Sequence, residues 1–257
     1  MRRMVLFFAL LATFAAAPAA MAEPPSAALR LYAAGEFVAA ADLADTQPSA
    51  SNRAFASRAL VAACAAAQSS GSIDALLVRA ETSARDALSL DPRSVDARLQ
   101  LALVYGMEGR RASLARAFAG RYASRGKRLI DEALAIEPTN AHAHAMLGAW
   151  NLEVVRRGGG VGALMYGAHA GTGLAEFERA RALAPGDMLI PLHFAVALLG
   201  LDPATYGPRA SRLLREVVAA SPGDALENLG QETAQRLQTA LARSPQDAQR
   251  LARGSIL

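Results

Sequence analysis

Four histidines are the residues of this chain best suited to metal binding or to acid–base catalysis: His142, His144, His169 and His193. His142 and His144 are two positions apart, so on one helix their side chains diverge by about 200° and cannot share a metal ion. No Asp-His or Glu-x-x-His spacing supports the others, and no Ser/His/Asp, Cys/His or paired-carboxylate arrangement is persuasive. The sequence therefore predicts no metal site, no cofactor and no catalytic residue, and we expect a protein that is not an enzyme.

Cys64 is the only cysteine of the chain, so no internal disulfide can form. It lies in the apolar run Val61–Ala66, with no histidine or basic residue nearby in sequence. We expect a small buried hydrophobic side chain rather than a redox-active or cross-linking thiol.

Seven basic residues fall within 19 positions that contain no acid: Arg110, Arg111, Arg116, Arg121, Arg125, Lys127 and Arg128. On a helix, Arg121, Arg125 and Arg128 would share one face. One interpretation of this segment is an anion-binding patch for phospholipid headgroups, a cell-wall polymer or an acidic partner. The alternative is a solvated face with local pairs, Lys127 with Asp131 and Arg128 with Glu132, worth about 0.3–0.5 kcal/mol each.

A second unusual segment, residues 158–173, contains seven glycines: Gly158, Gly159, Gly160, Gly162, Gly167, Gly171 and Gly173. It lacks the Gly-x-Gly-x-x-Gly spacing, the Gly-Lys-Ser/Thr ending and the preceding strand of a phosphate-binding loop. We expect a flexible loop that presents Leu164, Met165 and Tyr166 to a partner or to a second copy of the chain. The alternative is that these side chains fold back and cover the edge of the protein.

Both segments lie inside a repeated helical unit. The same pattern of apolar residues ends in proline at Pro92, Pro138 and Pro185, and again in weaker form at Pro222, with spacings of 46, 47 and 37 residues. A period in this range indicates a stacked array of helix pairs. Apolar residues at spacings of three and four predict one buried helical face per helix, and proline ends the helix.

The repeats resemble the tetratricopeptide repeat (TPR) family. Its first-helix signature is matched by Leu101-Ala102 and Tyr105 and by Leu147-Gly148, and its second-helix signature by Phe177, Ala180 and Pro185. The segment Leu147-Gly148-Ala149-Trp150, followed by an apolar insertion, is also similar to the repeat domain of the regulator of microtubule dynamics family. The TPR resemblance covers about residues 26–222. It implies an all-α, TPR-like α-solenoid of about five antiparallel helix pairs plus a C-terminal capping helix, with about a dozen extra residues in each of the two central units.

The resemblance also implies a concave groove, lined by first-helix side chains, that receives an extended peptide or a helix. Those positions fall on Asp96, Leu99, Leu103, His142, Ala145, Ala149, Leu189, Leu192 and Val196. The set is mostly apolar and small, which favours a helical or apolar segment of a protein partner. Alternatively, the chain fills the groove itself with the helix that starts at Asp224.

Residues 1–22 have the pattern of a secretory signal peptide, with Arg2 and Arg3, an apolar stretch Val5–Phe14 and the small-x-small site Ala20-Met21-Ala22. We expect cleavage after Ala22, a repeat domain over 23–243 and a C-terminal tail over 244–257. An uncleaved N-terminal anchor is the alternative.

The net charge of the chain is +4, but 26 of the 27 basic residues are arginines. Such a composition can reflect genome base composition, so nucleic-acid binding is not inferred.

Together these features predict a non-catalytic, bacterial periplasmic scaffold or adaptor that binds a protein or peptide through its concave face. The alternative is a protein of the envelope or of an anionic membrane surface that uses the arginine-rich insertion 110–128. The sequence determines neither the identity of the partner nor the oligomeric state.

Overall fold

The computed structural model describes residues 24–67 and 70–255, so the expected signal peptide lies outside the described residues. Within these ranges the chain forms thirteen helices and no strand. They are α1 (Ser26–Ala33), α2 (Phe37–Asp45), α3 (Ala50–Ala66), α4 (Ser70–Leu90), α5 (Val95–Arg111), α6 (Leu114–Ala119), α7 (Tyr122–Ile136), α8 (Ala141–Tyr166), α9 (Ala170–Leu183), α10 (Leu189–Leu201), α11 (Pro203–Ala219), α12 (Ala225–Arg243) and α13 (Pro245–Gly254).

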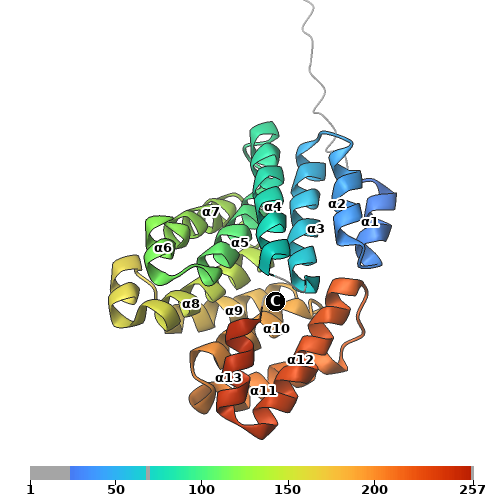
Figure 1. Cartoon of the computed structure of the whole chain (residues 1–257). Helices are drawn as coiled ribbons and strands as arrows, with labels where there is room; N and C mark the ends of the chain where they lie inside the picture. Colours follow the sequence, from blue (N-terminus) through green and yellow to red (C-terminus); the bar gives the residue numbers. More distant parts are fainter. Residues whose placement is uncertain (1–23, 68–69, 256–257) are drawn as a thin grey trace, which may run out of the picture.

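The helices stack as consecutive pairs along a curved solenoid (Figure 1). The pairs are α1–α2, α3–α4, α5–α7, α8–α9 and α10–α11, and the first helix of each later pair also packs on the pair before it. Polar side chains cap the starts of several helices: Ser94, Asn140 and Asp224 accept hydrogen bonds from the backbone N–H three residues on. The all-α solenoid expected from the sequence is confirmed.

Helices α8 and α9 pack unusually close together because glycines face each other. A methyl group on Gly148 would lie 2.7 Å from Cδ2 of Phe177 and 2.9 Å from the carbonyl oxygen of Gly173. Phe177 in turn stacks on Phe194 of α10, with ring centroids 4.5 Å apart, and both rings are fully buried. The glycine of the Leu147-Gly148 signature therefore permits the close helix approach that the repeat pattern implied.

The glycine-rich segment differs from the expected loop. Helical backbone continues through it to Tyr166, with a single break at Gly159, where φ is 55° and ψ is −153°. Glycine is suited to this backbone conformation because it has no Cβ. The chain turns back after the break, so that Gly162 approaches the carbonyl oxygen of Val154. The expected loop is therefore helical instead, whereas the expected exposure of Leu164 and Met165 is observed.

The described part of the expected C-terminal tail, residues 244–255, contains helix α13. Helix α13 packs against α10 and α12, with Ala248 and Ala252 buried. Its side chains bond to the end of α10: Arg253 Nε donates to the carbonyl of Gly200 at 3.1 Å. The expected capping helix α12 thus forms a sixth pair with α13.

The two ends of the solenoid meet. The start of α12 contacts α1 and α3, where Leu226 and Leu229 pack with Phe37 and Ala62. This contact brings the last repeat against the first, so the concave side is partly enclosed (Figure 1).

The close packing of α8 on α9 predicts that Gly148→Ala lowers the free energy of unfolding by about 1–3 kcal/mol, since the added methyl group overlaps Phe177 and the Gly173 backbone. Urea unfolding followed by circular dichroism measures this. The matched control is Gly106→Ala in α5, where an added methyl group meets no atom within 4 Å. The control should gain about 0.5–1 kcal/mol from helix propensity, and equal effects in the two variants would contradict the packing argument.

Candidate functional site

The concave side of the solenoid encloses a cavity of about 850 Å³. Its wall is formed by the first helices of four consecutive pairs, α3, α5, α8 and α10, and its edges by α6, α7, α12 and α13. The exposed area inside it is mainly apolar, with Leu99, Leu103, Met146, Trp150 and Val196 among the lining residues. Such a cavity matches the size and character of pockets that bind ligands.

Eight of the nine groove positions expected from the repeat register line this cavity: Asp96, Leu99, Leu103, His142, Ala145, Ala149, Leu189 and Val196. Leu192 does not. It is fully buried in the core, and its Cδ2 lies 3.2 Å from where a Cβ of Gly230 would be. Its placement from the repeat register was wrong because α12, which carries Gly230, packs on this side of α10.

One pair of polar side chains in the cavity wall joins α3 and α5. Arg58 and Asp96 form an ion pair with a nitrogen–oxygen distance of 2.7 Å. Tyr32 lies nearby, and burial together with the charge of Asp224 raises its pKa to about 12. Asp96 is therefore paired within the chain.

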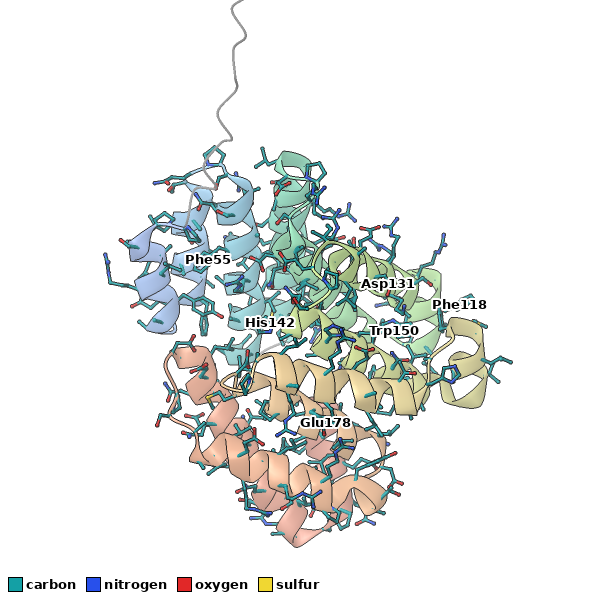
Figure 2. All side chains as sticks on the ribbon, turned by 180° about the vertical axis from the view of Figure 1, so that it is seen from behind. Phe55, Phe118, Asp131, His142, Trp150 and Glu178 are labelled. Carbon is teal, nitrogen blue, oxygen red and sulfur yellow. The ribbon has the colours of Figure 1, made fainter. Side chains whose placement is uncertain are left out.

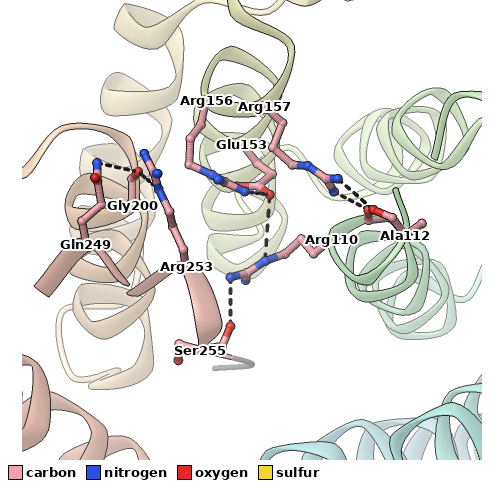
Figure 3. A network of polar contacts seen from close by, with 10 residues as sticks. Arg110, Ala112, Glu153, Arg156, Arg157, Gly200, Gln249, Arg253 and Ser255 are labelled. Atoms are coloured by element: carbon pink, nitrogen blue, oxygen red, sulfur yellow. Dashed lines mark hydrogen bonds and ion pairs between the residues drawn. The ribbon is translucent and has the colours of Figure 1, made fainter. Parts of the chain in front are cut away.

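A second polar group joins α5, α8 and the end of α13 (Figure 3). Glu153 accepts two hydrogen bonds from Arg156, at 2.6 and 2.7 Å, and lies 4.0 Å from Nε of Arg110. Arg110 also donates to the carbonyl of Ser255 at 2.9 Å, and burial lowers its pKa. Arg157 and Arg253 add two further guanidinium groups, so this part of the wall holds four arginines and one carboxylate.

This excess of positive charge was not anticipated at the groove. The sequence carried a signal for it, since the pair Arg156-Arg157 follows closely on a first helix whose earlier residues were assigned to the groove. The missing information was the length of α8. Its helical backbone extends past Val155 to Tyr166 and so carries both arginines along the wall.

Two of the four histidines, His142 and His193, line the same cavity and lie near Asp187, whereas His144 and His169 do not line it. His144 is buried between α8 and α9, with Nδ1 2.5 Å from Oε2 of Glu176 and Nε2 3.0 Å from the carbonyl of Pro138. His142 lies in the cavity wall, 3.7 Å from Asp187. Burial lowers the pKa of His193 to about 4, against the opposing effect of Asp187, so His193 is neutral at pH 7. Among the described residues, no group of three or more His, Cys, Asp or Glu side chains is placed to hold a metal ion.

The three arginines expected to form an anion patch do not share one helical face. Arg121 precedes α7 with a left-handed φ of 53°, and only Arg125 and Arg128 lie on the helix. The guanidinium of Arg125 stacks over the ring of Tyr105 at 3.8 Å and pairs with Glu81 at 3.4 Å. Arg128 pairs with Glu132, and Lys127 with Asp131, as the local-pair alternative predicted.

Cys64 is buried, and burial raises the pKa of its thiol to about 11. A thiol in this state is a poor nucleophile at pH 7, because the thiolate is the reactive form. The interpretation of Cys64 as a small buried hydrophobic side chain is therefore supported by its surroundings.

No family model matches the chain, and no curated protein matches it. Among solved structures, the chain is similar to a thermophilic TPR protein of Thermus thermophilus, with a TM-score of 0.57 and 17% sequence identity. The similarity covers 82% of this chain and 97% of that chain. The TPR-like fold implied by the repeat signature is confirmed, and at this level of identity the comparison shows the fold alone.

The low pKa of His193 predicts that the protein loses stability as the pH falls from about 6.5 to about 4. In this window the unfolded imidazole binds a proton and the folded one does not, so acid favours the unfolded state by at most about 3 kcal/mol. Thermal unfolding across this range should show a flatter pH dependence for His193→Gln than for the wild type. The control is His169→Gln, which removes an exposed imidazole, and an equal flattening in the control would contradict the assignment to His193.

Proposed function

We propose that this protein is a non-catalytic periplasmic scaffold that binds a helical or apolar segment of a protein partner inside its concave cavity. The observation that carries the proposal is the cavity itself, about 850 Å³ in volume and walled by the first helices of four repeats. A partner that displaces water from its apolar lining lowers the free energy of the complex, which favours binding. The TPR-like fold is consistent with a role in protein interaction.

The polar groups of the wall support binding rather than catalysis. Asp96 is paired with Arg58, and Glu153 with Arg156, so these two carboxylates are held by guanidinium groups. A carboxylate held in this way is a weak general base. These pairs are better suited to orienting a bound segment than to transferring protons.

The charge of the cavity wall indicates which kind of partner segment can bind there. Arg110, Arg156 and Arg157 lie around the single carboxylate of Glu153, which leaves net positive charge beside the apolar surface. We infer a partner segment with an apolar face followed by an acidic side chain, because that order places a carboxylate near the arginines.

The periplasmic location is supported by the pattern of residues 1–22. We predict that the mature protein begins at Glu23, since Ala20-Met21-Ala22 provides the small-x-small site of signal peptidase. Intact-mass measurement of the protein recovered from a periplasmic extract checks this. A mass that includes Met1 would contradict cleavage and favour the uncleaved anchor.

Binding in the cavity is tested by placing a photo-crosslinking amino acid at Leu103, which lines the cavity and is partly exposed. We expect one dominant protein adduct from envelope extracts. An excess of the unlabelled wild-type protein should compete this adduct away, whereas an excess of unlabelled Leu103→Asp should not. The matched position for the crosslinker is Val78 on α4, an exposed side chain that does not line the cavity.

The same adduct from both positions, or none from Leu103, would contradict the proposal. Circular dichroism and thermal unfolding of each variant separate loss of binding from loss of fold. Leu103→Asp is more informative than Leu99→Asp, because Leu99 is buried and its replacement also lowers stability.

A further inference from the structure

The two insertions present five large apolar side chains to solvent. Their exposed fractions are 60% for Leu114, 61% for Phe118, 75% for Val161, 86% for Leu164 and 59% for Met165. We call these five residues the insertion patch. Leu164 and Val161 are the two most exposed large hydrophobic side chains in the part of the chain that the structure describes. The fold alone gives no reason for this exposure, since these side chains contribute little to the core.

The two insertions lie next to each other. Arg157 of α8 donates hydrogen bonds to the carbonyls of Gly109 and Ala112, which hold α8 against the turn between α5 and α6. Leu114, Phe118 and Met165 all contribute to the edge of the same cavity. Figure 2 shows Phe118 at the outer edge of the molecule, away from Phe55 of the first repeats.

The insertions also hold the positive charge of the protein. Segments 109–130 and 154–175 together contain nine of the 27 lysines and arginines and none of the 23 acidic residues. The rest of the chain therefore has 18 basic and 23 acidic residues. Arg116 of α6 and Arg121, which precedes α7, are exposed, and neither has an ion-pair partner or a side-chain hydrogen bond among the described residues.

We propose that the insertion patch docks the protein on the surface of a bilayer that contains anionic lipids. Val161, Leu164 and Met165 would enter the boundary between headgroups and acyl chains, and Arg116 and Arg121 would contact lipid phosphates. Projecting apolar side chains flanked by unpaired arginines, with no acid nearby in sequence, match this interface in both polarity and charge. No helix among the described residues is long and apolar enough to cross a membrane.

Docking in this orientation brings the edge of the cavity to the membrane surface, because Leu114, Phe118 and Met165 belong to both. The inference is independent of the proposed function. The cavity variant Leu103→Asp should leave membrane binding unchanged. The variant Val161→Ser/Leu164→Ser should leave the Leu103 crosslink unchanged, because neither residue lines the cavity.

Vesicle flotation with the mature chain tests the proposal. We expect binding to vesicles of phosphatidylglycerol and phosphatidylethanolamine, no binding to vesicles of phosphatidylcholine alone, and weaker binding as salt is raised. The double variant Val161→Ser/Leu164→Ser should bind at least about tenfold more weakly. The double variant Arg116→Gln/Arg121→Gln should also bind more weakly and should depend less on salt.

Matched controls alter the same residue types elsewhere. Val78→Ser/Leu90→Ser changes two exposed apolar side chains of α4, and Arg250→Gln removes an exposed charge of α13. Both should bind like the wild type. Absence of binding to the anionic vesicles, or equal loss in patch and control variants, would overturn the proposal. So would a concentration-dependent dimer in analytical ultracentrifugation that Val161→Ser/Leu164→Ser abolishes, because the patch would then be an interface between two copies.

Discussion

The close approach of α8 and α9 at Gly148 and Gly173 is the constraint on which the centre of the structure depends. It brings Phe177 against Phe194, and the stacked rings join α9 to α10. Helices α8 and α10 form adjacent parts of the cavity wall, so this packing positions part of the wall.

Closure of the solenoid is the second constraint. An array of this kind ordinarily exposes its concave face along its whole length. Here the start of α12 returns to α1 and α3, and α13 bonds to the end of α10, so the concave face becomes a partly enclosed cavity. The contact of Leu226 and Leu229 with Phe37 and Ala62 is apolar, which makes the closure part of the folded core rather than a surface salt bridge.

Local patterns in the sequence predicted the repeats because they depend on neighbouring residues. Apolar spacing and terminal prolines placed most of the helices, and eight of the nine residues assigned from the repeat register line the cavity. Leu192 was misplaced because α12, distant in sequence, covers it. The helical glycine-rich segment and the arginines around Glu153 were missed because they also involve contacts between residues distant in sequence. The hydrogen bonds of Arg157 to Gly109 and Ala112, for example, join positions 48 and 45 residues apart.

The exposed side chains of the insertions need an explanation that the fold does not provide. Each glycine inside a helix costs about 1 kcal/mol relative to alanine, and Leu164 and Val161 recover little of this because most of their surface stays in water. In the core repeats, by contrast, large apolar side chains are almost completely buried, as for Phe177, Phe194 and Leu152. A segment that adds apolar surface without burying it, and that carries unpaired arginines beside it, has the physical character of a binding surface. An anionic bilayer satisfies both its apolar and its charged groups at once.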